Sequence, residues 1–234
     1  LYAGRMPIRY LPDHLVNQIA AGEVIERPAA VVKELVENAL DAGARKITVS
    51  CREGGKSLIR VTDDGCGMSR EDLICATDRH ATSKLPDDDL VHIQTLGFRG
   101  EALPSIGSVS RMTIKSRQAD GGDDSGWSIS IEGGRKSDPV PAAVAKGTDI
   151  EVRDLFYATP ARLKFMKSDR AEYLAIREMV MRLAMAFPDV DFTLNHDGKT
   201  MLSFDIVQGE LLESQLGRLG AVMGKEFSEN ALAV

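Results

Sequence analysis

The sequence of 234 residues is 43% hydrophobic and 27% charged, with a formal net charge of −6. This is an ordinary globular composition with ample material for a core, and the negative charge argues against a surface uniformly coated with nucleic acid. No apolar run is long enough to span a bilayer and no secretory signal opens the chain, so we expect no membrane association and a cytoplasmic location.

Residue patterns predict the elements of the first part of the chain. Residues 1–5 carry no structural pattern and are interpreted as a cloning remnant or an over-extended start. Pro28 suits the first turn of a helix and Gly43 its end, while Gly54-Gly55 favours a hairpin between two alternating strands. The predicted elements are helices over residues 15–21 and 28–42, strands over 46–52 and 58–63, a short helix capped by Ser69, a helix opening at 101–106, and strands over 109–116, 127–132 and 148–153.

Two loops in this part are polar. The loop over residues 77–100 is long, which is typical of a functional or mobile segment, and the loop over 118–125 is acidic. Further along, Asp197-Gly198 is a strong two-residue hairpin signal. The predicted elements there are a helix over 169–187 with Leu174, Met181 and Met185 near one face, strands over 191–195 and 200–204, and a helix over 210–219.

This order of elements predicts an α+β fold. We expect a two-layer first module over residues 6–155, with helices on one face of a mixed sheet, and a second α/β module over residues 156–234.

The three cysteines, Cys51, Cys66 and Cys75, form no C-x-x-C pair, and their number is odd. Neither a zinc site nor a disulfide framework is indicated, and we expect reduced, buried thiols.

The helix over residues 28–42 carries polar side chains on a segment that otherwise resembles core. Glu34, Asn38 and Asp41 are spaced i, i+4 and i+7, so they form one stripe. An amide oxygen is a hard ligand for Mg²⁺, and a carboxylate one turn away can orient or deprotonate water. The alternative is a solvated acidic face, which the stripe alone favours about two to one.

Three further stretches fit a nucleotide site. Asp63 stands at a strand end before Gly65 and Gly67, where a carboxylate can accept from an amine while the backbone lets a flat ring approach. Residues 79–84 place two cations and two hydroxyls in a loop. Residues 97–103 lead glycines into a helix N-terminus, which favours an anion but does not match the P-loop pattern. Each has an ordinary turn or solvated loop as its alternative.

In their order and spacing these motifs closely resemble the N-terminal ATPase region of the MutL family of DNA mismatch-repair proteins, above all its bacterial members. The family belongs to the GHKL ATPase superfamily with type II topoisomerases, heat-shock chaperones and sensor histidine kinases. The resemblance covers nearly everything after Met6, and three stretches point to MutL in particular: residues 17–24, 97–103 and 156–162. It implies the GHKL (Bergerat) ATPase fold, followed by part of a ribosomal S5-like transducer domain.

The resemblance also implies roles for individual residues. Glu34 would be the general base, Asn38 would ligate Mg²⁺, and Asp63 would accept the adenine amino hydrogen of ATP, whereas Glu37 would be structural. Asp64 stands where superfamily members often have Asn and would add negative charge near the base pocket. The implied cofactor-binding residues are Asn38, Asp63, Gly65, Gly67, Met68, Thr82, Ser83, Lys84, Gly97, Phe98, Arg99, Gly100, Glu101, Ala102 and Thr148.

The family uses ATP as a switch, so the resemblance implies nucleotide-dependent homodimerisation in which residues 17–21 take part. The implied partners are the mismatch-recognition protein MutS, a downstream repair nuclease or helicase, and DNA. Residues 153–182 carry a net charge of +3 against −9 for the remainder, and they are a candidate for sequence-independent phosphate contacts. A solvated helix face, with Arg162 serving structure, is an equal alternative.

The family's transducer domain continues beyond the point matched by residue 234 and supplies a lysine to the γ-phosphate. We therefore expect a fragment that binds nucleotide but turns ATP over weakly. Two other classes stay open: a non-hydrolysing DNA-binding or interaction module with a vestigial site, and another superfamily enzyme such as a topoisomerase subunit or a histidine kinase.

Overall fold

A computed structural model describes residues 10–79, 81, 84, 95–97, 100–118, 125–207, 209 and 211–230. The predictions for residues 1–5 and for most of the acidic loop over 118–125 lie outside these residues.

One mixed sheet organises the part of the chain that the structure describes. Its strand order is β5-β4-β3-β7-β2-β1-β8-β9, with β6 paired to β4. Neighbours are antiparallel except β1 and β8, which run parallel. The strands are β1 (Lys46–Arg52), β2 (Leu58–Asp63), β3 (Arg111–Arg117), β4 (Trp127–Glu132), β5 (Arg135–Lys136), β6 (Val140–Pro141), β7 (Gly147–Arg153), β8 (Asp191–His196) and β9 (Lys199–Phe204).

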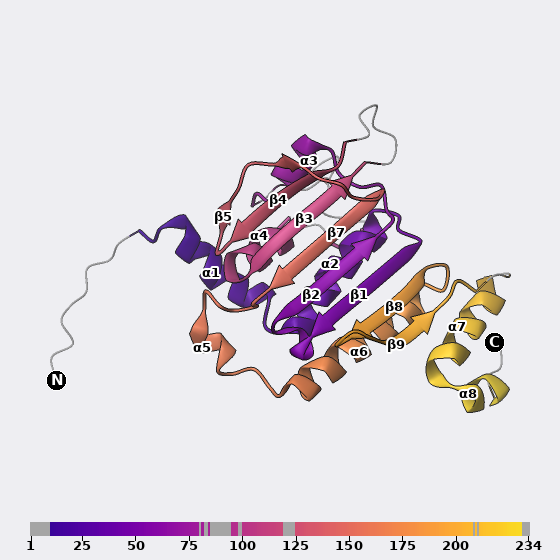
Figure 1. Cartoon of the computed structure of the whole chain (residues 1–234). Coiled ribbons are helices and arrows are strands. Elements are labelled where there is room, and N and C mark those ends of the chain that lie inside the picture. The colour runs from indigo at the N-terminus through magenta and orange to yellow at the C-terminus, as the bar shows by residue number, and fades with distance from the viewer. Residues whose placement is uncertain are drawn as a thin grey trace, which may run out of the picture.

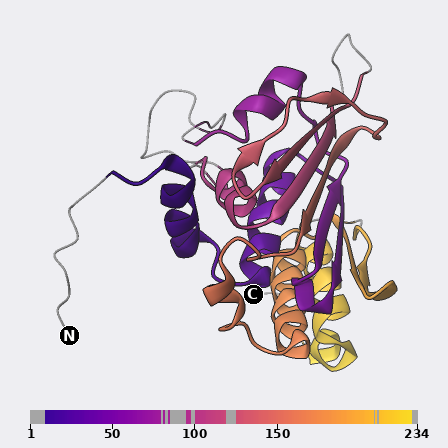
Figure 2. The same cartoon turned by 60° about the vertical axis from the view of Figure 1, so that its left-hand side comes forward.

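Helices cover one face of this sheet. Figure 1 views the open face, with α2, α4 and α6 behind the strands, and Figure 2 shows the same layering from another side. The helical elements are α1 (Asp13–Val24), α2 (Pro28–Asp41), the 3₁₀ turn η1 (Glu53–Gly55), α3 (Arg70–Cys75), α4 (Ala102–Val109), α5 (Pro160–Leu163), α6 (Asp169–Ala186), α7 (Leu211–Met223) and α8 (Lys225–Asn230). The predicted α+β class, with helices on one face of a mixed sheet, is confirmed.

The core lies between the sheet and the helices, because buried and more exposed side chains alternate along the strands. In β1, Ile47, Val49 and Cys51 are buried toward the helices, and the residues between them face the open side. The helix α2 contributes Val32, Leu35, Val36 and Ala39 from one stripe, so its opposite side stays available for polar side chains.

The buried stripe of α6 includes Tyr173, Ile176 and Val180, and the predicted face of Leu174, Met181 and Met185 lies beside it, with Leu174 49% exposed. The prediction of buried cysteines is wrong for two residues. Two of the three cysteines, Cys66 and Cys75, are exposed. Only Cys51 is buried, and that burial raises its pKa to about 12.

The predicted second module joins the first through the sheet. The strand β8 pairs with β1 along its whole length, and β9 follows at the edge. On the helical face of the sheet, α6 packs against α2. Arg27, just before α2, donates from Nε and Nη2 to Glu172 Oε2 of α6 at 3.0 and 2.9 Å. The division into domains at residue 155 stays a prediction.

Within the described ranges, no helix combines the length and the apolar character that crossing a membrane requires.

Candidate functional site

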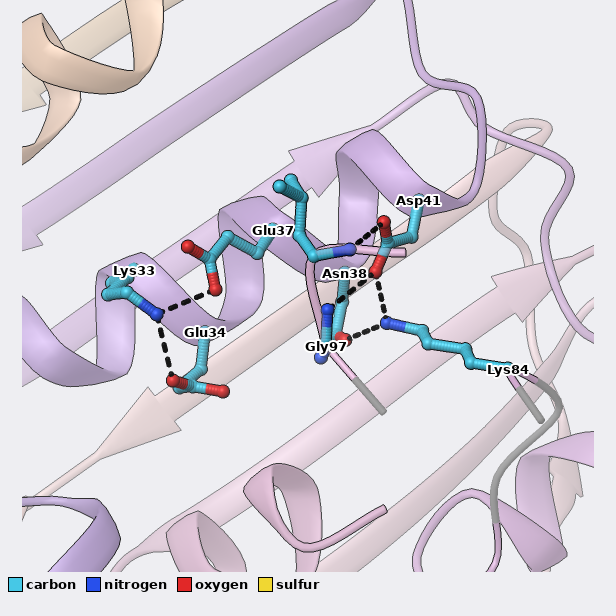
Figure 3. Close-up of polar contacts among 8 residues, drawn as sticks. Lys33, Glu34, Glu37, Asn38, Asp41, Lys84 and Gly97 are labelled. Atoms are coloured by element: carbon cyan, nitrogen blue, oxygen red, sulfur yellow. Dashed lines mark hydrogen bonds and ion pairs between the residues drawn. The ribbon is translucent and has the colours of Figure 1, made fainter. Parts of the chain in front are cut away.

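The polar stripe of α2 forms the centre of the site. Pro28 opens the helix, and the apolar stripe fixes its rotation against the sheet. Glu34, Asn38 and Asp41 therefore lie together on the half-buried side, as their spacing predicts (Figure 3).

Lys84 reaches this stripe from the long loop. Its Nζ donates to Asn38 Oδ1 at 2.8 Å and to Asp41 Oδ2 at 2.5 Å. Figure 3 shows the lysine pointing at both side chains. The side chain of Lys84 is 21% exposed and that of Asp41 is 8% exposed, so the ion pair is largely shielded from water. The amide oxygen of Asn38 thus already binds a cation.

Asp41 also holds the glycine segment that precedes α4. Its carboxylate accepts the backbone N–H of Leu96 at 3.0 Å and of Gly97 at 3.3 Å. The sequence placed Asp41 on the stripe but gave it no role. In the structure it is the residue that joins α2, Lys84 and the glycine segment.

The two glutamates of α2 share Lys33. Its Nζ lies 2.7 Å from Glu37 Oε2 and 3.3 Å from Glu34 Oε1 (Figure 3). Burial acts to lower the pKa of Lys33, but its hydrogen bond to Glu37 and the charges of both carboxylates outweigh burial and raise it. Glu37 is 13% exposed and Glu34 28% exposed, so Glu34 is the more accessible of the two to water.

Asp63 forms a second centre at the end of β2. Its carboxylate accepts the backbone N–H of Gly65 at 2.9 Å and that of Thr148. Burial raises the pKa of Asp63 to about 6, against the opposing effect of these two hydrogen bonds. The neighbouring charge of Asp64 adds to the rise. A carboxylate so placed can accept a hydrogen bond from an amine.

Asp64 has a structural task of its own. Its Oδ1 accepts the backbone N–H groups of Arg45 and Lys46, each at 2.8 Å, at the point where β1 begins. These contacts need the oxygen of Asp64 but not its charge, and that charge still acts on Asp63.

The glycine loop after Asp63 is pinned to the end of α2. The N–H of Cys66 donates to Ala42 O at 2.9 Å, and a Cβ on Gly65 would lie 2.9 Å from the same oxygen. Gly67 has φ +69°, and a Cβ there would lie 2.0 Å from the carbonyl oxygen of Arg117. These positions require glycine, and they connect the Asp63 centre to the helix that carries Asn38.

Ser116 is a supporting residue that the sequence analysis missed. It is fully buried, and its Oγ accepts the N–H of Met68 at 2.8 Å and lies 3.0 Å from both Gly147 O and Thr148 Oγ1. The available signal was a hydroxyl at an inward position of an alternating strand, after Met112 and Ile114.

Gly100, from the predicted stretch 97–103, lies against Ala81, from the predicted stretch 79–84. It has φ +62°, and a Cβ there would lie 2.5 Å from Ala81 O. Glu101 stands at the start of α4 and its carbonyl accepts the N–H of Ser105 at 3.0 Å, while Ala102 opens the helix. The predicted site residues Thr82, Ser83, Phe98 and Arg99 lie outside the described residues.

The side-chain oxygens at the end of α2 fit a magnesium ion whose other ligands are phosphates and water. In the described ranges no group of three or more His, Cys, Asp or Glu residues could hold a metal ion. Asn38 Oδ1 is a hard oxygen that already contacts a cation, with the carboxylate of Asp41 one turn away. Mg²⁺ is commonly bound in this way, by one or two side chains together with phosphates and water.

Comparisons with known proteins agree with this geometry. Residues 26–141 match the family of histidine kinase-, DNA gyrase B- and HSP90-like ATPases. DNA mismatch repair protein MutL of Paramagnetospirillum magneticum is 60% identical over 229 residues, 98% of this chain, and that of Rhodospirillum rubrum is 58% identical over the same length. The chain spans only 37% and 36% of these relatives.

A solved structure carries the assignment. The Aquifex aeolicus MutL ATPase domain complexed with ADP is 34% identical, with a TM-score of 0.68 over 86% of this chain and 70% of that one. The chain therefore belongs to the MutL family of DNA mismatch repair proteins and corresponds to an N-terminal ATPase fragment of that family.

Proposed function

We propose that this chain binds ATP together with Mg²⁺ and hydrolyses it to ADP and phosphate. The observation that carries the proposal is the junction at the end of α2. There Asn38 and Asp41 hold Lys84, and Asp41 also holds Gly97. The contact of Cys66 with Ala42 connects these residues to the Asp63 centre. The ADP bound to the Aquifex aeolicus domain supports a nucleotide as the ligand.

The roles follow from the chemistry of each group. Asp63 accepts from the adenine amine, and Gly65 and Gly67 leave room for the ring. Asp41 holds the N–H of Gly97, so the backbone N–H groups at the start of α4 are the ones that would face the phosphates. Asn38 Oδ1 would hold Mg²⁺ together with the phosphates. A bound Mg²⁺ would neutralise part of the phosphate charge. Phosphoryl transfer leaves the protein little covalent work, so positioning and electrostatics supply most of the catalysis.

Glu34 is proposed as the general base. Its carboxylate takes a proton from water as the oxygen attacks the γ-phosphorus and ADP leaves. Glu34 is more exposed than Glu37, and Lys33 holds Glu37 at the shorter distance, 2.7 Å. Both observations support the choice of Glu34.

The function of the whole protein is part of the proposal, because the chain spans only 37% of its first relative. We propose an ATP-driven switch in the cytoplasm that links mismatch recognition by MutS to a repair nuclease or helicase. It would dimerise with nucleotide and bind DNA without sequence preference. Weak turnover by this chain alone belongs to the same proposal.

A matched pair of substitutions tests the hydrolysis. Glu34→Gln should lower the single-turnover rate of ATP hydrolysis about 10²–10⁴-fold, the usual contribution of a general base, and leave nucleotide binding intact. Glu37→Gln, on the same helix, should change the rate only severalfold. Equal losses in both variants would reject Glu34 as the base, and binding without measurable hydrolysis in the unsubstituted chain would favour the non-hydrolysing module.

A further inference from the structure

We propose that Lys84 occupies the cation position at Asn38 and Asp41 in the nucleotide-free protein, and that Mg²⁺ binds there only by displacing it. This inference rests on the proposed function, since it concerns how the metal reaches the same site.

The contacts of Lys84 are those of a cation in a small oxygen site. Its Nζ lies 2.8 Å from Asn38 Oδ1 and 2.5 Å from Asp41 Oδ2, an amide oxygen and a carboxylate on successive turns of α2. Figure 3 shows the side chain extended from the loop to reach both. One oxygen is neutral and one is charged, so the site attracts a cation even without nucleotide.

The ammonium and a metal ion exclude each other at this site. Mg²⁺ binds oxygen at about 2.0–2.1 Å, so an ion on Asn38 Oδ1 would lie within a few ångströms of Nζ. The site is largely shielded from water, with Lys84 21% and Asp41 8% exposed. Repulsion between a double and a single charge at that separation is strong in such surroundings. Lys84 must therefore leave before the metal enters.

Asp41 keeps its backbone hydrogen bonds when Lys84 leaves. Its carboxylate keeps the N–H groups of Leu96 and Gly97, at 3.0 and 3.3 Å, so the glycine segment stays attached to α2 during the exchange. The departing ammonium needs another anion, and the phosphates of an arriving nucleotide supply one. Metal binding is thereby coupled to nucleotide binding through the charge of Lys84.

The test measures a metal alone. Mn²⁺, a paramagnetic substitute for Mg²⁺, is titrated without nucleotide into the unsubstituted chain and into Lys84→Met, with bound ion followed by electron paramagnetic resonance. Loss of the competing charge should tighten Mn²⁺ binding at least about tenfold. The gain should disappear in the double variant Lys84→Met/Asn38→Ala.

Two further variants keep the test decisive. Lys84→Gln removes the charge but keeps a hydrogen-bond donor, and it should reproduce the gain if Lys84→Met folds poorly. Lys199→Met changes an exposed lysine on β9 and should leave Mn²⁺ binding unchanged. Equal Mn²⁺ affinity with and without the Lys84 charge would overturn the proposal, as would an equal gain in Lys199→Met.

Failure of the proposed function would look different. The unsubstituted chain would then not bind an ATP analogue with Mg²⁺ at all. The Mn²⁺ comparison would still report whether Lys84 holds the cation position.

Discussion

Asp63 is held where its charged form is disfavoured. Burial raises its pKa to about 6 in spite of two backbone hydrogen bonds, whereas an aspartate in an unfolded chain titrates near 3.9. The folded protein therefore prefers the neutral carboxyl. Its contribution to stability is complete below the unfolded pKa and is lost as the pH rises through about 6. At neutral pH the site keeps a carboxylate at a cost in stability, which is the behaviour expected of a binding group.

Replacing Asp63 with Asn should separate stability from binding. The amide keeps one acceptor oxygen, which can serve the N–H of Gly65, but carries no charge. We expect the variant to be more stable than the parent at pH 8 by roughly 1–3 kcal/mol, allowing for screening by water, with the difference shrinking to near zero as the pH falls toward 4. Denaturant unfolding across this range measures it. The same variant should bind adenine nucleotides more weakly.

A constant stability difference at every pH would show that the raised pKa of Asp63 is not the cause. Asp64→Ala is a useful comparison, because it removes the oxygen that accepts the N–H groups of Arg45 and Lys46 and should destabilise the protein.

Only some of the site residues and their roles could be predicted from the sequence. Glu34, Asn38 and Asp41 were placed together because a helix repeats every 3.6 residues, and that arrangement is local. The role of Asp41 was missed because its partners Lys84 and Leu96 lie more than 40 residues away in the chain. Ser116 was missed for the same reason, since it acts between Met68 and Gly147, which neighbouring strands bring together.

At the scale of elements, the predictions were best where the pattern was local and strong. The strands β1, β2 and β4 have the bounds that were expected, because alternation and flanking glycines or turns define them. The two-residue strands β5 and β6 were not predicted, since only pairing with β4 defines them. The helices α5 and α8 are too short to show periodicity.

One buried cation anchors α7 to the rest of the molecule. Arg218 is fully buried and donates to five backbone carbonyls, with the shortest contact, 2.8 Å, to Val190 O. Burial lowers its pKa, while nearby aspartates including Asp191 act to raise it. The carbonyls belong to the end of α6, the segment leading into β8 and the residue after β9, so a single side chain fixes how α7 lies on them.

Replacing Arg218 with Met should therefore loosen α7. The substitution leaves several buried carbonyls unpaired, and we expect a loss of roughly 2–4 kcal/mol in the free energy of unfolding, with faster amide exchange in α7. Arg182→Met, at an exposed position of α6, should stay within about 0.5 kcal/mol of the parent. Similar losses in both variants would contradict the anchoring role.

At the scale of the whole molecule, the sheet explains why the site is continuous. The order β3-β7-β2-β1 brings Ser116, Thr148 and Asp63 onto adjacent strands, and α2 crosses behind them with Asn38 near its end. The parallel pairing of β1 with β8 links segments about 145 residues apart, which periodicity cannot reveal. The family resemblance indicated the ATPase fold, but only the structure shows this continuation of the sheet.

The central claim is that Asn38 and the Asp63 centre form one magnesium–nucleotide site. The most direct test is calorimetric titration of this chain with a non-hydrolysable ATP analogue, with and without Mg²⁺. Asn38→Ala is the test variant, and Asn230→Ala, at an exposed position of α8, is its control. We predict saturable, Mg²⁺-dependent binding that the control keeps and Asn38→Ala loses. Absence of binding in the unsubstituted chain, or equal binding in both variants with or without Mg²⁺, would contradict the account.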